Sequence, residues 1–226
     1  MTPLSRNALA RMVANHLPSE SFVNLGIGAP TMVANALDAS QGVILHSENG
    51  LLNVGPAPAE GEENHDLINA GKQPVTTLPG ASFFDSSLSF SMMRGGHIDV
   101  AVLGAFQVSE DGDLANWNTG RDDGAPPAVG GAVDLAVGAS QIWVMMEHTT
   151  RDGAPRIVSR CTMPLTAVGV VRRIFTNLCL ITVTDAGLVV DAMIDDLELK
   201  DLQALTEATL TAAPALRTIN SDGIVT

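Results

Sequence analysis

Residues 43–50 read VILHSENG, an apolar run that ends in a polar turn. Short apolar runs bounded by turn residues are typical of buried strands, and Asn-Gly is a strong turn signal. Residues 22–28 (FVNLGIG) repeat this pattern, with a strand that ends in glycines. The sequence therefore predicts two buried strands, one ending at the carboxylate of Glu48 and the other at a glycine-rich turn.

Helical segments alternate with the strands. Ser5 is suited to cap a helix in which Leu9, Met12, Val13 and Leu17 recur at helical spacing. We expect further helices after a Thr31 cap and over residues 86–93, 132–137 and 195–205, and further strands over residues 100–108, 141–146, 180–184 and 188–192. This alternation predicts an α/β fold with a mainly parallel sheet covered on both faces.

Ligands of such sheets gather at the carboxyl ends of the strands. Three polar or glycine-rich turns fall at predicted strand ends: residues 26–30, residues 47–50 and the stretch after Val108. We expect these three turns to converge on one site.

Length and charge limit the classes of function. The 226 residues suffice for one domain, with a core over about residues 5–205 and a tail over residues 206–226. Only 16% of residues are charged, so we expect a partner chain to cover part of the surface. The net charge of −13 argues against nucleic acid and anionic membranes as partners. The sequence shows no targeting or membrane-spanning segment, so we expect a cytoplasmic protein.

Metal and redox motifs are not evident. Cys161 and Cys179 stand in apolar surroundings without a Cys-x-x-Cys pair, so we expect buried thiols. His65 lies among acidic residues, but the spacing matches no ligand motif. We therefore predict no metal site.

Glu48 is the first candidate for chemistry. A glutamate at a strand end is commonly just solvated, but a carboxylate presented there can also act as a covalent nucleophile toward a thioester. Such acyl transfer passes through oxyanions that need fixed N–H donors. Gly130 and Gly131 precede the helix expected from Ala132 and could supply them, although they could equally be a flexible loop end.

Few other residues suggest a role at this site. Lys72 and Arg94 could bind a phosphate or a second carboxylate, or be ordinary surface cations. His46 shares a strand face with Glu48, and could either tune it or pack as a polar core residue.

Several motifs together resemble the B subunits of family I CoA-transferases, over roughly residues 5–205. They are NLGIGAP (24–30), LHSENGLL (45–52), DLINAGK (66–72), MMRGGH (92–97), GDLANW (112–117), GGAVDL (130–135) and CTMPLT (161–166). The resemblance implies a three-layer α/β/α fold of the CoA-transferase superfamily type. It also implies that CoA is a substrate, that no cofactor is permanently bound, and that an A subunit completes the site in an A2B2 assembly.

The resemblance implies roles for individual residues. Glu48 falls on the family's nucleophile, and Gly131 on the glycine whose amide helps to form the oxyanion hole. The remaining matches are expected to bind CoA or substrate: Asn24, Gly26, Gly28, Asn49, Lys72, Asn116 and Gly130.

Two features depart from the family pattern. Asn53 stands where the family usually has Gly or Ala, so we expect its side chain to crowd the loop behind Glu48. Residues 121–123 form a charged insert without an evident role.

Details of the motifs favour one branch of the family. His46, SFSMMRGG (89–96), LGAFQV (103–108) and NWNTG (116–120) resemble the 3-oxoadipate:succinyl-CoA transferases, which implies a place in aromatic degradation by the β-ketoadipate pathway. The alternative acceptor is acetoacetate or a related 3-oxoacid. An alternative of another class is a sugar-phosphate-sensing regulatory protein on the same scaffold, which would lack SENG and the paired glycines.

Overall fold

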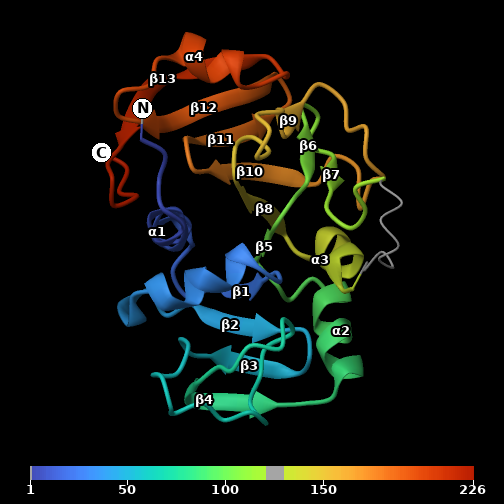
Figure 1. Ribbon diagram of the computed structural model, residues 1–226. Coiled ribbons are helices and arrows are strands. Elements are labelled where there is room, and N and C mark those ends of the chain that lie inside the picture. The colour runs from blue at the N-terminus through green and yellow to red at the C-terminus, as the bar shows by residue number, and fades with distance from the viewer. Residues whose placement is uncertain (1, 121–129) are drawn as a thin grey trace.

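A large sheet runs through the protein, which is described here by a computed structural model covering residues 2–120 and 130–226. Its strands are β1 (Phe22–Leu25), β2 (Ile44–Ser47), β3 (Leu51–Val54), β4 (Thr77–Phe83), β5 (Val100–Leu103), β8 (Gln141–Met146), β10 (Val171–Thr176), β11 (Cys179–Thr184), β12 (Gly187–Ile194) and β13 (Leu210–Ile219). Their order in the sheet is β13-β12-β11-β10-β8-β5-β1-β2-β3-β4 (Figure 1).

The centre of the sheet is parallel and apolar. Strands β2, β1, β5, β8 and β10 pair in parallel, whereas β3 and β4 at one end, and β11 and β12 toward the other, pair antiparallel. All four residues of β5 are buried, and so are all those of β8 except Gln141. This confirms the prediction of buried parallel strands, whose sequences read as continuous apolar runs because both faces are covered.

Helices cover both faces of the sheet. They are α1 (Arg6–His16), α2 (Ser86–Arg94), α3 (Ala132–Gly138) and α4 (Leu199–Ala204), with the 3-10 helices η1 (Ala29–Ala36) and η2 (Ala39–Gln41). In Figure 1, α1 and η1 lie on one side of the sheet, and α2 and α3 on the other. The three-layer α/β/α fold is therefore confirmed. Within the described part of the chain, no helix has the length and apolar character needed to cross a membrane.

The predicted start of α1 is confirmed. Ser5 Oγ accepts a hydrogen bond from the Ala8 amide at 3.2 Å, as an N-cap does. Leu9, Met12 and Val13 are buried on the face of the helix that packs toward the sheet.

The short helix after the first strand differs from its prediction. It is a 3-10 helix that begins at Ala29, not an α-helix capped by Thr31. Gly28 is its N-cap residue, with φ +90°, and Pro30 lies in its first turn. The Thr31 hydroxyl donates back to the Gly28 carbonyl oxygen, so it closes this turn instead of capping a later one.

The strand predicted over residues 100–108 is two strands in two sheets. Strand β5 ends at Leu103, and β6 (Gln107–Ser109) joins a small sheet with β7 (Leu114–Ala115) and β9 (Ile157–Val158), in the order β7-β6-β9. The break falls at Gly104, which lies inside an apolar run and therefore leaves no change in polarity to mark it.

Residues 206–226, expected as a tail outside the core, contain the edge strand β13. This strand pairs in parallel with β12, and both of its ends, Leu210 and Ile219, are buried. Most residues between them are exposed, so β13 lacks the apolar alternation by which a strand is recognised.

Candidate active site

Glu48 lies in the tight turn between β2 and β3. The Gly50 amide closes this turn with a hydrogen bond of 3.0 Å to the Ser47 carbonyl oxygen. Gly50 has φ +110°, and a side chain there would overlap the carbonyl of Phe84. The predicted Asn-Gly turn is thus confirmed, and it leaves the Glu48 side chain half-buried at the carboxyl end of β2.

Gly131 is in direct contact with the Glu48 carboxylate. Its backbone amide donates a hydrogen bond to that carboxylate, and a Cβ built on Gly131 would overlap Glu48 Oε2. Gly131 is the N-cap residue of α3, so its amide is not used by the helix. The prediction that the paired glycines present an amide at Glu48 therefore agrees with the geometry.

Three influences act on the pKa of Glu48. Burial raises this pKa, the hydrogen bond from the Gly131 amide lowers it, and the nearby charge of Asp134 raises it further. The net shift is upward. Burial and the charge of Asp134 therefore outweigh the hydrogen bond, so the ionised carboxylate is less stabilised here than it would be in water.

A cavity of about 350 Å³ opens beside Glu48. It is lined by Gly26, Ile27, Glu48, Leu103, Gly104, Ala105, Phe106, Asn116, Gly130, Gly131, Ala132, Leu135 and Arg156. Four of the other predicted site residues therefore meet Glu48 here: Gly26, Asn116, Gly130 and Gly131. The third converging turn is residues 104–106, at the end of β5, and not the stretch after Val108 that we expected.

Similarity to known proteins decides the family. Residues 6–205 match the sequence model of the family described as coenzyme A transferase. The chain belongs to the coenzyme A transferase family. It is 57% identical over 203 residues to the B subunit of 3-oxoadipate CoA-transferase from Pseudomonas putida, across 90% of this chain and 94% of the relative. It is 54% identical over 207 residues to the protein of the same name from Acinetobacter baylyi, across 92% and 95% of the two chains.

Solved structures of this fold extend the comparison. An acyl-CoA transferase from Escherichia coli O157:H7 superposes with a TM-score of 0.74 at 18% identity, over all of this chain and 46% of the larger protein. This chain thus spans about half the length of that enzyme. Glutaconate CoA-transferase from Acidaminococcus fermentans gives a TM-score of 0.66 at 14% identity, over 96% and 88% of the two chains. At such low identity these structures support the fold alone.

Four of the residues that we expected to bind CoA or substrate in this CoA-transferase do not line the Glu48 cavity. Gly28 turns the chain into η1, and Asn24 is only 2% exposed, with its side chain directed at His46. Asn49 is exposed, and its amide donates to the Ile68 carbonyl oxygen at 2.7 Å. Lys72 is also exposed, in a left-handed turn with φ +61°.

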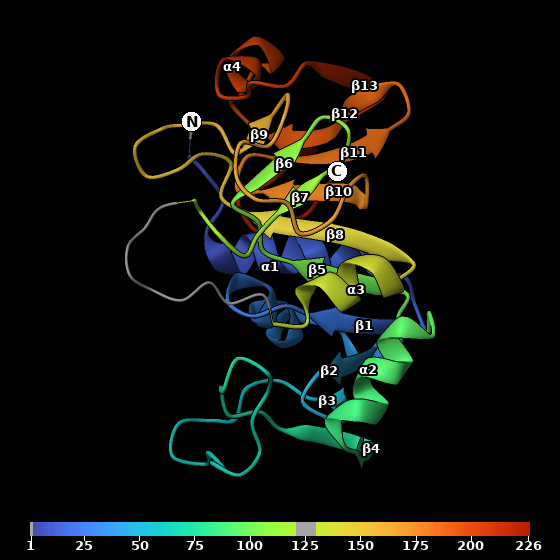
Figure 2. The same ribbon diagram turned by 90° about the vertical axis from the view of Figure 1, so that its right-hand side faces the viewer.

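Asn49 and Ser47 tether the long loop of residues 55–76 to the turn that carries Glu48. Besides the bond from Asn49, the Ala70 amide donates to Ser47 Oγ at 3.1 Å. Figure 2 shows this loop as the teal segment that reaches out beside β2 and β3. Lys72 is two residues beyond the second tether, so the turn that carries Glu48 also fixes the base of the segment that carries Lys72.

His46 packs beneath the site as a buried, neutral side chain. It is 2% exposed, and burial lowers its pKa to about 4. The Asn24 amide donates to His46 Nδ1 at 2.9 Å, so His46 Nε2–H donates to Ser89 Oγ at 2.9 Å. The Phe84 ring stacks on the imidazole, with 6.2 Å between centroids. Of the two interpretations of His46, the structure favours a packed polar residue.

Arg94 is an ion-paired base. Its Nε lies 2.6 Å from Asp134 Oδ1, and its guanidinium lies over the Phe90 ring, 5.6 Å from the centroid. The pair joins α2 to α3, the helix that begins beside Gly131. Arg94 therefore helps to position α3.

Asn53 does not crowd the site. It has φ +62° at the point in β3 where the register with β4 shifts, and its side-chain amide donates to the Pro79 carbonyl oxygen at 3.0 Å. Its side chain is directed at β4, so our expectation was wrong. A bulge with positive φ favours Gly, which explains the small residue expected there, and Asn tolerates it best among larger residues. The charged insert of residues 121–123 lies outside the described residues.

Cys179 is a buried thiol, as expected, whereas Cys161 is only partly buried. Burial raises the pKa of Cys161 to about 11 and that of Cys179 to about 12, so neither is poised as a thiolate. Among the described residues, no three His, Cys, Asp or Glu side chains cluster as metal ligands would.

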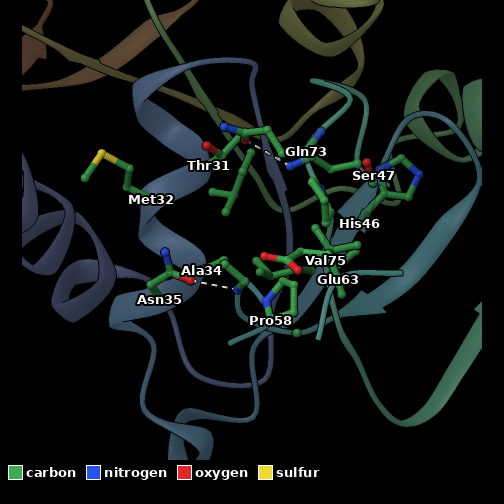
Figure 3. Close-up of a pocket in the computed structure, with 17 residues that line it drawn as sticks. Thr31, Met32, Ala34, Asn35, His46, Ser47, Pro58, Glu63, Gln73 and Val75 are labelled. Atoms are coloured by element: carbon green, nitrogen blue, oxygen red, sulfur yellow. Dashed lines mark hydrogen bonds between the residues drawn. The ribbon is translucent and has the colours of Figure 1, made fainter. Parts of the chain in front are cut away.

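A second cavity, of about 400 Å³, lies beneath the loop of residues 55–76 (Figure 3). Thr31 and Asn35 of η1 form one wall, and Pro58 and Glu63 of the loop form another. The Asn35 side chain fastens this loop by accepting a hydrogen bond from the Ala57 amide at 2.9 Å. Neither Glu48 nor Gly131 lines this cavity, so it is separate from the cavity in which those two residues meet.

Proposed function

We propose that this chain transfers CoA from succinyl-CoA to a 3-oxoacid, with 3-oxoadipate as the acceptor, through a thioester on Glu48. One observation carries the proposal: a half-buried carboxylate of raised pKa touches a free backbone amide in a cavity at the carboxyl ends of parallel strands. A solvated strand-end glutamate would have neither the raised pKa nor the amide.

The first half of the reaction loads CoA onto the enzyme. The Glu48 carboxylate attacks the thioester carbonyl of succinyl-CoA, which forms a mixed anhydride and expels CoA as its thiolate. The thiolate then attacks the glutamyl carbonyl, so that succinate leaves and a Glu48–CoA thioester remains. This second attack places an oxyanion on the carboxyl group of Glu48, beside the Gly131 amide that already donates to it.

The second half reverses these steps with another acid. A carboxylate of the acceptor attacks the Glu48 thioester, forming a mixed anhydride and releasing CoA thiolate. The thiolate attacks the acceptor's carbonyl, and the new acyl-CoA leaves with Glu48 restored as a carboxylate. Atoms and charge balance without a metal, redox group or permanently bound cofactor, because CoA is itself the group transferred.

The choice of 3-oxoadipate is supported by the names of the relatives. Those at 57% and 54% identity are 3-oxoadipate CoA-transferase B subunits, whereas a Bacillus subtilis protein named as a probable succinyl-CoA:3-ketoacid transferase subunit is 43% identical. The second candidate acceptor is therefore acetoacetate. Comparing kcat/KM for 3-oxoadipate with that for acetoacetate, with succinyl-CoA as the donor, decides between them.

We also propose an A subunit as partner, in an A2B2 assembly in the cytoplasm, acting in the β-ketoadipate pathway. The relatives are named as B subunits, and large apolar side chains are exposed on this chain, among them Ile27 (61%) and Phe83 (68%). Ile27 lines the Glu48 cavity, so a partner that covers it would also help to close that cavity.

The mechanism is tested by trapping the enzyme thioester. The complex with the A subunit is incubated with succinyl-CoA, treated with hydroxylamine or borohydride, and mapped by peptide mass spectrometry. We expect the modification on Glu48, and we expect Glu48→Ala and the closer match Glu48→Gln to abolish transfer while the complex still forms. An unmodified Glu48, or Glu48→Ala activity within tenfold of the wild type, would refute the mechanism. Tight binding of a sugar phosphate without thioester exchange would instead indicate a regulatory protein.

A further inference from the structure

Arg156 lies where two cavities adjoin. It lines the Glu48 cavity and also a neighbouring cavity of about 550 Å³. The two cavities share Ile27, Gly104 and Ala105 as well, so they meet around the turn that follows β5. Arg156 thus faces the space in which a ligand of Glu48 would extend. The sequence motifs gave no indication of it.

The backbone of Arg156 is held rigidly. Its amide donates to the His148 carbonyl oxygen at 3.3 Å, and its carbonyl oxygen accepts from the Val108 amide at 2.9 Å. It directly precedes β9, the strand that pairs with β6. Arg156 is therefore presented by the sheet framework and not by a loose surface loop.

The guanidinium of Arg156 is incompletely paired. Its Nε atom is buried and has no hydrogen-bond partner among the described residues. Glu48 lines the same cavity, yet the structure records no ion pair between these two described side chains. The other candidate cations are differently placed, because Arg94 is paired with Asp134 and Lys72 is exposed.

A buried charged donor without an acceptor is costly, unless a ligand supplies the acceptor. A guanidinium matches a carboxylate with two parallel N–H donors. We propose that Arg156 binds the free carboxylate of a dicarboxylic acyl group whose other end reacts at Glu48. The inference rests on the proposed CoA transfer and identifies what recognises the second carboxylate. Succinyl-CoA and 3-oxoadipate both carry such a group, so one arginine serves both halves of the reaction.

The test compares donors with and without the distal carboxylate. The complex with the A subunit is mixed with succinyl-CoA or with butanoyl-CoA, which has the same carbon chain but ends in a methyl group. The readout is kcat/KM for forming the Glu48 thioester. In Arg156→Gln we expect the preference for succinyl-CoA to fall on the order of 10- to 100-fold, with the butanoyl-CoA rate nearly unchanged. Arg156→Lys keeps the positive charge but loses the two parallel N–H donors of the guanidinium. This variant should retain part of the preference for succinyl-CoA over butanoyl-CoA.

Arg151→Gln is the matched control. Arg151 lines the neighbouring cavity but not that of Glu48, so its loss should leave the ratio between the two donors unchanged. Co-elution with the A subunit and the melting temperature verify that each variant is folded. An equal fall for both donors in Arg156→Gln would overturn the inference while leaving the Glu48 mechanism intact. If the wild type forms no thioester on Glu48 with either donor, the proposed function fails, and this inference fails with it.

Discussion

At the scale of single residues, the space beside Glu48 depends on the missing side chain of Gly131. Gly131 has φ −81°, which any residue can adopt, so backbone strain does not demand glycine there. Glycine is required at this position because a Cβ on residue 131 would overlap Glu48 Oε2. We expect Gly131→Ala to displace the carboxylate and lower kcat on the order of 100-fold, as the loss of an oxyanion donor does, with the melting temperature little changed.

Gly104→Ala is the control that distinguishes overlap with Glu48 from a general loss of space in the cavity. Gly104 lines the same cavity, but a Cβ there would meet no atom within 4 Å, and its φ is not positive. We expect a much smaller fall in kcat for this variant. Equal losses in the two variants, measured by steady-state transfer from succinyl-CoA, would show that bulk in the cavity matters and contact with Glu48 does not.

Asp134 provides a second test at this scale. Its charge, together with burial, raises the pKa of Glu48, and only the ionised carboxylate can attack a thioester. The rate of thioester formation should therefore fall at low pH, with a midpoint above the usual range of a glutamate. Asp134→Asn removes one of the causes, so we expect this midpoint to move to lower pH in stopped-flow pH profiles. Movement to higher pH would mean that loss of the Arg94 pair displaces α3.

At the scale of elements, the turn after β2 and the loop of residues 55–76 form one unit. Asn49→Ala removes the bond to the Ile68 carbonyl oxygen, which in this exposed position contributes about 0.5–1 kcal/mol to local stability. We expect amide hydrogen exchange over residues 67–72 to accelerate by about threefold. In Asn53→Gly, which removes a similar bond to Pro79 from β3 and suits the positive φ, exchange over residues 67–72 should stay as in the wild type. Equal acceleration in both variants would refute the tether.

Elements with a strong local signal could be predicted from the sequence. Helix α1 has a Ser cap and a periodic apolar face, and the turn at Glu48 has Asn-Gly. The break at Gly104 could not be predicted, because its neighbours Leu103 and Ala105 are both apolar and buried, although the strands before and after it belong to different sheets. Strand β13 was missed because pairing with β12, and not burial of its side chains, holds most of it in place.

Some residues of the candidate site could likewise be predicted from the sequence, and others could not. Glu48 and Gly131 could be identified because they lie within short motifs, and so does Asn116. Arg156 could not, since its importance comes from a buried, unpaired Nε atom that exists only after folding. Asn24 shows the opposite error: its motif was correctly noticed, but the side chain turns away from the cavity to His46.

At the scale of the whole molecule, two buried histidines make stability depend on pH. His46 lies in β2, and His148 follows β8, where it is 1% exposed between Thr176 and Thr206. Burial lowers the pKa of each to about 4, from 6.5 when unfolded. In each case Nε2–H donates to a hydroxyl, and Nδ1 accepts a hydrogen bond, from Asn24 in one and Thr176 in the other. Protonation of His46 would set its Nδ1–H against the Asn24 amide, so that two donors face each other, and protonation of His148 would require the Thr176 hydroxyl to accept where it now donates.

The sign of the effect follows from these pKa values. The folded state prefers the neutral imidazole, so both contributions to stability are complete above pH 6.5 and are lost as the pH falls from 6.5 toward 4. At pH 5 the loss amounts to about 2 kcal/mol for each histidine. We expect the free energy of unfolding, measured by denaturant titration at pH 7.5 and pH 5, to fall by about 4 kcal/mol from this pair. His16, whose pKa burial also lowers, adds to the fall.

Replacing either histidine should halve the contribution of the pair. In His46→Gln and in His148→Gln, whatever their stability at pH 7.5, the fall on going to pH 5 should be smaller than in the wild type by about 2 kcal/mol. His65 is exposed in the loop of residues 55–76, so His65→Gln should show the full wild-type fall. If all three variants lose as much stability as the wild type, the acid sensitivity arises elsewhere, and the two buried imidazoles are not what sets the lower pH limit of the fold.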